Sequence, residues 1–144
     1  MSLQRGDVIK VVEHGKVVIE AHPLVILLVH GTELLISNIT DIENEDEVFC
    51  VLEIKDDPRI LTLKSTFRYQ DIRLVPITLI EGSLEKGGFK YFGKLSDVAF
   101  AKILRGVKLA RFRNKEHKQL LLNSISVPAR TMAVPKDSRP SFEA

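Results

Sequence analysis

The chain lacks the residues on which several protein classes depend. Its 144 residues include no tryptophan and a single cysteine, Cys50, so it cannot form an internal disulfide scaffold and suits a reducing compartment, for which we expect the cytoplasm. No apolar run approaches the roughly 20 residues that cross a bilayer, and the polar start MSLQRGDV is unlike a signal peptide. We therefore expect no membrane partner. Cys50 itself lies in the apolar run VFCVLEI, where a thiol is usually inert.

Motifs for metals and cofactors are missing as well. The histidines are not at the spacing of zinc ligands and no cysteine pair accompanies them, so we expect no metal. Neither GxxxxGK[ST] nor GxGxxG nor GxSxG occurs, so nothing indicates a nucleotide-binding loop or a serine hydrolase. We therefore expect that the protein uses no cofactor.

The charges present are nearly balanced but unevenly distributed. The net charge is only +2, yet residues 41–57 hold eight carboxylates against one lysine, and residues 102–118 hold seven cations against one glutamate. Such asymmetry allows a polyanion partner on the basic side. A basic run on a helix is more often only its solvated face, so the partner is not required.

Short strands dominate the first half of the chain. Val, Ile, Leu and Phe recur between turn signals such as His14-Gly15 and His30-Gly31. This pattern predicts strands over residues 7–13, 16–20, 24–29, 34–39, 48–54, 60–63, 67–70 and 72–75. So many short strands within under 70 residues predict a small barrel or a half-open one. The strands at 24–29 and 34–39 are apolar on both faces, so we expect them to be central and covered on each side.

Helices are expected in the second half. Ser96 is a typical N-cap before an apolar stripe with helical spacing, which predicts a helix over 96–111 that covers the central strands. Gly106 within it costs about 1 kcal/mol relative to alanine, so we expect close packing there. A second helical piece is expected over 115–125, and an extended or disordered tail beyond Pro128. Residues 76–93 are expected to be a connecting segment.

One hairpin places chemically useful side chains together. Pro23 belongs at the first residue of its strand, because it cannot donate to a sheet ladder. His22 then stands at the entrance of the 24–39 hairpin and Thr40 at its exit, and the open ends of an antiparallel hairpin lie side by side. The sequence therefore predicts an imidazole beside a hydroxyl at one end of the sheet. The alternative is that Pro23 and Thr40 merely begin and end strands.

Five motifs in fixed order extend this interpretation. They are RGDV at 5–8, HPLVI at 22–26, IT at 39–40, YQDIRLV at 69–75 and KLSD at 94–97. Their order and spacing resemble those of the MazF/PemK family, the toxin components of bacterial toxin–antitoxin pairs. The resemblance covers roughly residues 5–111, which makes residues 112–144 a C-terminal extension.

The resemblance implies a fold and an activity. It implies a mainly β fold with added α structure (α+β), a small SH3-like antiparallel barrel with the C-terminal helix 96–111, in a homodimer. It also implies metal-independent endoribonuclease activity on single-stranded RNA, blocked by a small antitoxin protein. Two other functions stay open, a non-catalytic barrel that binds nucleic acid or a protein partner, and an assembly protein that docks through residues 112–144.

The resemblance and the chemistry together suggest site residues. Thr40 matches the family's residue at the end of the strand, whereas His22 stands where the family usually has arginine. Histidine ordinarily titrates near pH 6.5 and is suited to proton transfer, so we expect His22 to be a general acid or base and Thr40 to donate to a phosphate oxygen. For RNA binding we expect positive charge from His14, Lys16 and Arg73, and stacking faces from Phe67 and Tyr69.

Overall fold

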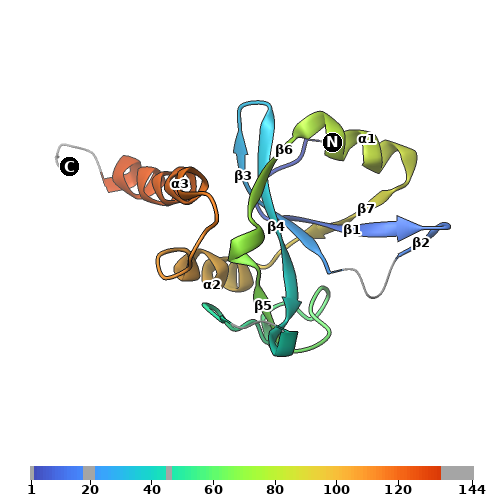
Figure 1. The fold of residues 1–144 in the computed structure, drawn as a ribbon, viewed down its shortest axis with the longest axis horizontal. Helices are drawn as coiled ribbons and strands as arrows, with labels where there is room; N and C mark the ends of the chain where they lie inside the picture. The colour runs from blue at the N-terminus through green and yellow to red at the C-terminus, as the bar shows by residue number, and fades with distance from the viewer. Residues whose placement is uncertain (1, 18–21, 45–46, 134–144) are drawn as a thin grey trace.

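A computed structural model of the protein describes residues 2–17, 22–44 and 47–133, with side chains to residue 125. Within these residues seven strands form one antiparallel sheet and three α-helices pack around it (Figure 1). The expected class, mainly β with added α structure, is therefore confirmed.

The sheet is built around the predicted hairpin. The central strands are β1 (Asp7–Glu13), β3 (Leu24–His30) and β4 (Glu33–Asp41), in the order β1-β3-β4. The short β2 (Lys16–Val17) and β7 (Phe89–Lys94) both pair with β1, whereas β5 (Ser65–Phe67) and β6 (Arg73–Pro76) both pair with β4. Among the described residues the edges β7 and β5/β6 do not pair with each other. The sheet therefore stays open, which is the half-open form of the expected barrel.

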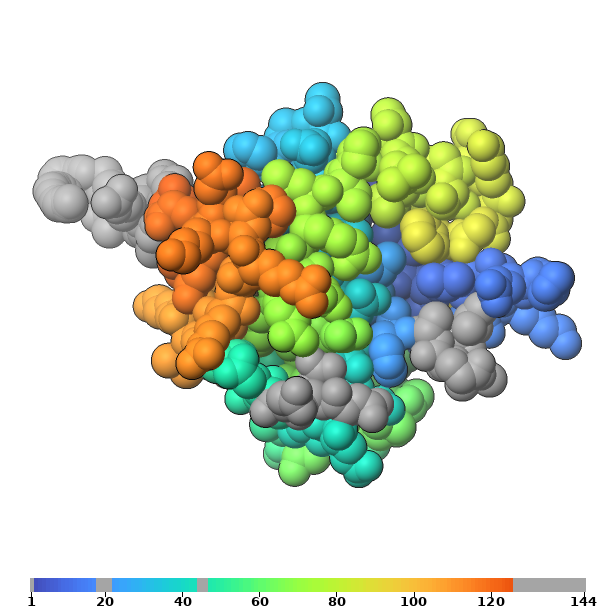
Figure 2. Space-filling view, in the orientation of Figure 1, coloured from blue at the N-terminus to red at the C-terminus, as the bar shows by residue number. Residues whose placement is uncertain are grey.

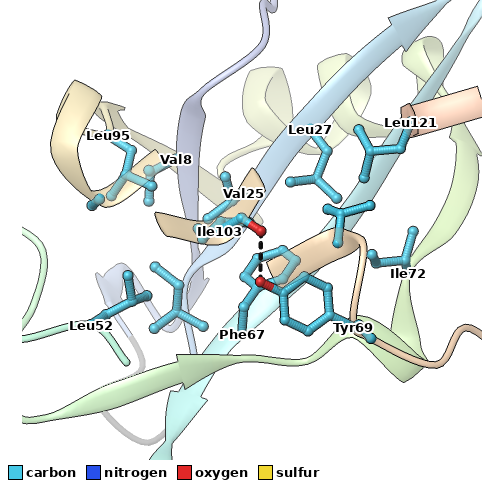
Figure 3. Packing of buried hydrophobic residues seen from close by; sticks show 14 of the residues in the cluster. Val8, Val25, Leu27, Leu52, Phe67, Tyr69, Ile72, Leu95, Ile103 and Leu121 are labelled. Carbon is cyan, nitrogen blue, oxygen red and sulfur yellow. Dashed lines mark hydrogen bonds between the residues drawn. The ribbon is translucent and has the colours of Figure 1, made fainter. Parts of the chain in front are cut away.

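Both faces of the sheet are covered, as the apolar hairpin predicts. One face packs Ile9, Ile26 and Ile36 against α1 (Ile77–Lys86), which joins β6 to β7. The other face packs Val25, Leu27 and Leu35 against α2 (Asp97–Val107) and the first part of α3 (Lys115–Ala133), and Figure 3 shows Ile103 of α2 beside Val25 in this core. The prediction that the helix capped by Ser96 covers the hairpin is confirmed, and Ser96 Oγ accepts a hydrogen bond from the amide of Ala99 at 3.1 Å.

Close packing at Gly106 is confirmed too. Tyr69 Oη donates a hydrogen bond of 2.6 Å to the carbonyl of Ile103 on α2, drawn as a dashed line in Figure 3. A Cβ on Gly106 would collide with that hydroxyl and would lie 2.8 Å from the carbonyl oxygen of Phe49. The glycine therefore lets α2 approach the sheet.

Residues 76–93 are not the connecting segment that we expected. They form α1 and most of β7. Pro76 occupies the N-cap of α1, and Gly87 ends it in the left-handed conformation at φ 86°. The strand β7 forms because residues 89–94 pair with β1, a contact that local sequence does not reveal.

Two strand predictions in the middle of the chain are wrong. The expected strands at 48–54 and 60–63 are loops, apart from a single bridge between Leu52 and Ser65 and a 3₁₀ turn at Ile54–Asp56. The Asp57 carbonyl accepts from the amides of Ile60 and Leu61 instead. Leu52, Ile60 and Leu61 fill the core without pairing as strands. The other aliphatic residues of these segments are exposed, namely Val48, Val51, Ile54 and Leu63. The expected strand at 67–70 also ends early, because β5 stops at Phe67 and a 3₁₀ turn follows at Tyr69–Asp71.

The C-terminal ends of α2 and α3 both differ from the prediction. The helix α2 stops at Val107 rather than at residue 111. Just beyond its end, the amides of Leu109 and Ala110 both donate to the carbonyl of Gly106. The helix α3 begins at Lys115 as expected but continues through Pro128 to Ala133. Proline has a helical φ and removes one hydrogen bond, so it does not exclude a helix. Residues 134–144 of the expected tail lie outside the described residues.

Candidate active site at the open end of the β3–β4 hairpin

Backbone pairing brings His22 and Thr40 together. The amide of Ile39 donates to the carbonyl of Pro23 at 3.0 Å, and Asn38 Nδ2 donates to the carbonyl of His22 at 3.2 Å. The first bond continues the β3–β4 ladder past its first registered pair, Leu24 with Asn38, and the second ties the backbone of His22 to a side chain of β4. As a result His22 Nε2 lies 3.3 Å from Thr40 Oγ1, within hydrogen-bond distance.

The surroundings of the pair differ for its two members. Thr40 is 2 % exposed and faces Thr66 across the β4–β5 pair, whereas His22 is half-buried. Thr66 uses its own hydroxyl to donate to the carbonyl of Cys50 at 2.6 Å. A hydroxyl as buried as that of Thr40 is suited to fixing the imidazole in one orientation. The ring of His22 is then the part of the pair that a substrate can reach.

Arg68 is a cation that the sequence analysis missed, and its backbone lies beside β4. Its amide donates to the carbonyl of Asn38 at 2.9 Å, so its backbone lies beside the strand that carries Thr40. Its side chain is 35 % exposed, and its Nε lies 3.1 Å from a carboxylate oxygen of Asp71. The other oxygen of Asp71 lies 3.8 Å from Arg113, so one carboxylate sits between two guanidinium groups. The register of β4 with β5, which local sequence does not show, is the signal that places Arg68 here.

The other basic residues expected to bind RNA lie on separate elements. Arg73 is exposed on β6, where it pairs with Ile36 of β4 and donates to the carbonyl of Asp71 at 3.0 Å. Alternation along β4 puts Ile36, Asn38 and Thr40 on one face, so Arg73 shares the face of the candidate site. His14 and Lys16 are exposed at the β1–β2 turn, which Figure 1 places at the far right, away from the β4–β5 end of the sheet.

The two aromatic residues expected to stack on RNA bases are part of the core. Phe67 and Tyr69 are both buried and contact each other edge to face, with ring centroids 5.3 Å apart. Burial also raises the pKa of the Tyr69 hydroxyl. Their faces are not available to a base, so this expectation is wrong. The alternation that suggested a shared exposed face is equally typical of residues that face a core.

Other chemistry near the site is limited. Burial raises the pKa of the Cys50 thiol, which disfavours the nucleophilic thiolate at neutral pH. Among the residues that the structure describes, no group of three His, Cys, Asp or Glu side chains could hold a metal ion. In the same residues no helix has the length and apolar composition that a membrane span requires.

Comparison with known proteins does not extend this picture. No protein-family model matches the chain, and no curated protein matches it either. The likeness to the MazF/PemK family therefore rests on the ordered motifs alone.

Proposed function

We propose that the protein is a metal-independent, MazF/PemK-like endoribonuclease that cleaves single-stranded RNA in the cytoplasm. The observation that carries the proposal is the 3.3 Å contact between His22 Nε2 and Thr40 Oγ1 at the open end of the hairpin. This contact places a partly exposed imidazole, a group that can take and return a proton, beside a buried hydroxyl that can orient it.

The proposed reaction divides the work among three side chains. His22 takes the proton of the substrate's 2′-hydroxyl, whose oxygen attacks the adjacent phosphorus. The bond from phosphorus to the 5′-oxygen breaks, and the imidazolium of His22 gives that proton to the leaving oxygen. His22 serves as the proton-transfer group, a role that contributes roughly 10²–10⁴-fold. Thr40 orients the imidazole through the contact at 3.3 Å. Arg68 contacts the phosphate, because a guanidinium offers permanent charge and paired donors.

The test is incubation of the purified protein with a long single-stranded RNA in EDTA. We expect cleavage products that end in a cyclic phosphate, and a loss of at least about 100-fold in rate for His22→Ala. Thr40→Val keeps the shape of threonine but removes the hydroxyl, so its loss in rate is expected to be smaller. Arg68→Gln is expected to raise KM more than His22→Ala does.

The control variant is His30→Ala, which changes an exposed histidine at the opposite end of the same strand. It is expected to cleave like the wild type. Intact RNA with the wild-type protein would contradict the proposal, as would equal rates for the wild type and His22→Ala.

A second candidate function is the non-catalytic binding of a protein partner, either a small antitoxin or a second copy of the chain. An open groove of about 290 Å³ beside α2 favours it, and its lining includes Phe49, Val51 and Leu109 together with Lys102 and Arg105. Leu109 is 71 % exposed there. Exposed apolar side chains that gather in this way are typical of a protein interface.

A further inference from the structure

Two lysines and an aromatic ring meet on β1 and β7, outside the proposed cleavage site. Lys10 of β1 is directly opposite Lys90 of β7 in the strand register. Lys10 Nζ lies 4.1 Å from the centroid of the Phe92 ring. Directly opposite residues share a face of the sheet, so Lys10 and Lys90 lie on one face. Phe92 is the extra residue where the β1–β7 register shifts, and its contact with Lys10 places its ring on that same face. We call these three side chains the Lys10–Lys90–Phe92 surface.

This surface is partly open to solvent and lies on the side of the molecule opposite α3 (Figure 1). Lys90 is exposed, and Lys10 and Phe92 are half-buried. Figure 1 places β2 and the adjoining part of β1 on the right, opposite α3. Figure 2 shows the blue atoms of β1 and β2 at the end of the molecule opposite the orange atoms of α3. By alternation Lys10 shares the face of Val8, whereas His22 shares that of Leu24, which belongs to the core on the other side of the sheet.

The two lysines of this surface place like charges opposite each other. Like charges directly opposite each other in a sheet are destabilising. Within the described part of the chain, no carboxylate lies within ion-pair distance of Lys10 or Lys90. Burial also lowers the pKa of Lys10. An anion placed between the two ammonium groups would relieve both effects.

We propose that the Lys10–Lys90–Phe92 surface binds single-stranded nucleic acid, with the lysines on phosphates and the ring of Phe92 stacked on a base. Lys10 now covers the ring through a cation–π contact. Its ammonium group moves to a phosphate when a base takes its place. Only an unpaired strand offers the face of a base to such a ring. The inference goes beyond the proposed cleavage and does not depend on it.

The test measures binding of a fluorescein-labelled oligouridine by fluorescence anisotropy over a range of salt concentrations. The oligouridine carries 2′-O-methyl groups and cannot be cleaved through its 2′-oxygen, so binding is measured even if the cleavage proposal fails. Each phosphate contact on a single strand contributes about −0.7 to the slope of log K against log salt. The double variant Lys10→Gln/Lys90→Gln is therefore expected to bind more weakly and with a slope smaller by about 1.4.

The matched control is Lys55→Gln/Lys64→Gln, which removes the same charge from two exposed lysines on the segment below α2. It is expected to keep the wild-type slope. Lys90→Glu changes only an exposed position, so it tests the surface even if the double variant fails to fold. A wild-type protein that does not bind the oligonucleotide would overturn the inference. So would a control variant that loses as much affinity as the Lys10/Lys90 variant.

Phe92→Leu separates stacking from charge. It is expected to lower the affinity roughly ten-fold or more without a change in slope, because base–aromatic stacking is lost while the phosphate contacts stay. Oligothymidine is expected to bind like the oligouridine, since lysine and phenylalanine contact phosphate and base rather than sugar. Equal competition by inorganic polyphosphate or by duplex RNA at the same phosphate concentration would contradict the contact with a base.

Discussion

Gly106 shows how the absence of one side chain controls the fit of a helix. It costs helix propensity, yet it lies where the Tyr69 hydroxyl and the Phe49 carbonyl reach α2. We expect Gly106→Ala to lower the free energy of unfolding by about 1–3 kcal/mol, the usual cost of overpacking, although alanine is the better helix former. Urea denaturation followed by circular dichroism measures this change.

Gly82 offers the matched control for that substitution. It lies inside α1, and a Cβ there would meet no atom within 4 Å. Gly82→Ala is expected to raise the free energy of unfolding by roughly 0.5–1 kcal/mol, through helix propensity alone. If both substitutions stabilised the protein, the close packing of Tyr69 on α2 would be ruled out.

At the residue scale, the sequence predicts which side chains meet across a hairpin better than it predicts which side chains are buried. The meeting of His22 and Thr40 follows from a proline and a turn that local patterns identify. The burial of Phe67 and Tyr69 does not, because a strand with alternating aromatic residues looks alike whether it faces a core or solvent. The position of Arg68 could not be predicted, because only the pairing of β5 with β4 brings it beside Asn38.

At the scale of elements, the 3₁₀ turn at Ile54–Asp56 is fastened to the start of α2. Lys102 Nζ lies 2.7 Å from the carboxylate of Asp56, which also accepts from the amide of Glu53 at 2.8 Å. The carboxylate of Asp57 accepts from the amide of Ser96 at 2.8 Å, and the Ser96 hydroxyl donates to the carbonyl of Asp56 at 2.5 Å. These contacts hold in place a loop that we expected to be two strands.

The fastening predicts a dependence of stability on pH. The hydrogen bond from Lys102, followed by that from the Glu53 amide, lowers the pKa of Asp56 below its ordinary value of 3.8. A carboxylate whose pKa is lower in the folded state stabilises the protein above its unfolded pKa, and this contribution is lost as the pH falls through the folded pKa. We therefore expect the wild type to lose more stability between about pH 5 and pH 2 than Asp56→Asn does.

Urea denaturation at a series of pH values provides that measurement. Glu85→Gln is the control, because Glu85 is exposed near the end of α1. It is expected to show the same loss as the wild type. An equal loss for Asp56→Asn would mean that the ion pair with Lys102 does not contribute to folding.

Elements differ in how far local patterns define them. The hairpin β3–β4 and the cap of α2 follow from turn and capping residues close in sequence. The helix α1 carries comparable signals, with Pro76 before it and Gly87 after it. Because Gly87 is followed by a second glycine, Gly88, the segment resembled a flexible loop. The strand β7 forms only through its pairing with β1. Among the described residues, segment 48–54 pairs with a strand only through the bridge from Leu52 to Ser65.

At the scale of the whole molecule, the groove beside α2 leads to a prediction about assembly. If it is the interface of a homodimer, Leu109→Lys puts a charge into the contact, and light scattering is expected to show a fall from about twice the chain mass of 16.2 kDa to that mass. Leu79→Lys is the control, since Leu79 is 57 % exposed on α1 and away from the groove. A wild-type protein of single-chain mass would contradict the homodimer.

The pairing of β1 with β7 affects how the protein folds during synthesis. Residues 7–11 of β1 pair with residues 89–94 of β7. During synthesis this edge of β1 therefore stays unpaired until β7 has emerged from the ribosome. The β3–β4 hairpin needs only its own residues and can close much earlier. A nascent chain can therefore bring His22 and Thr40 together early, while the edge of β1 that β7 later covers stays unpaired during much of synthesis.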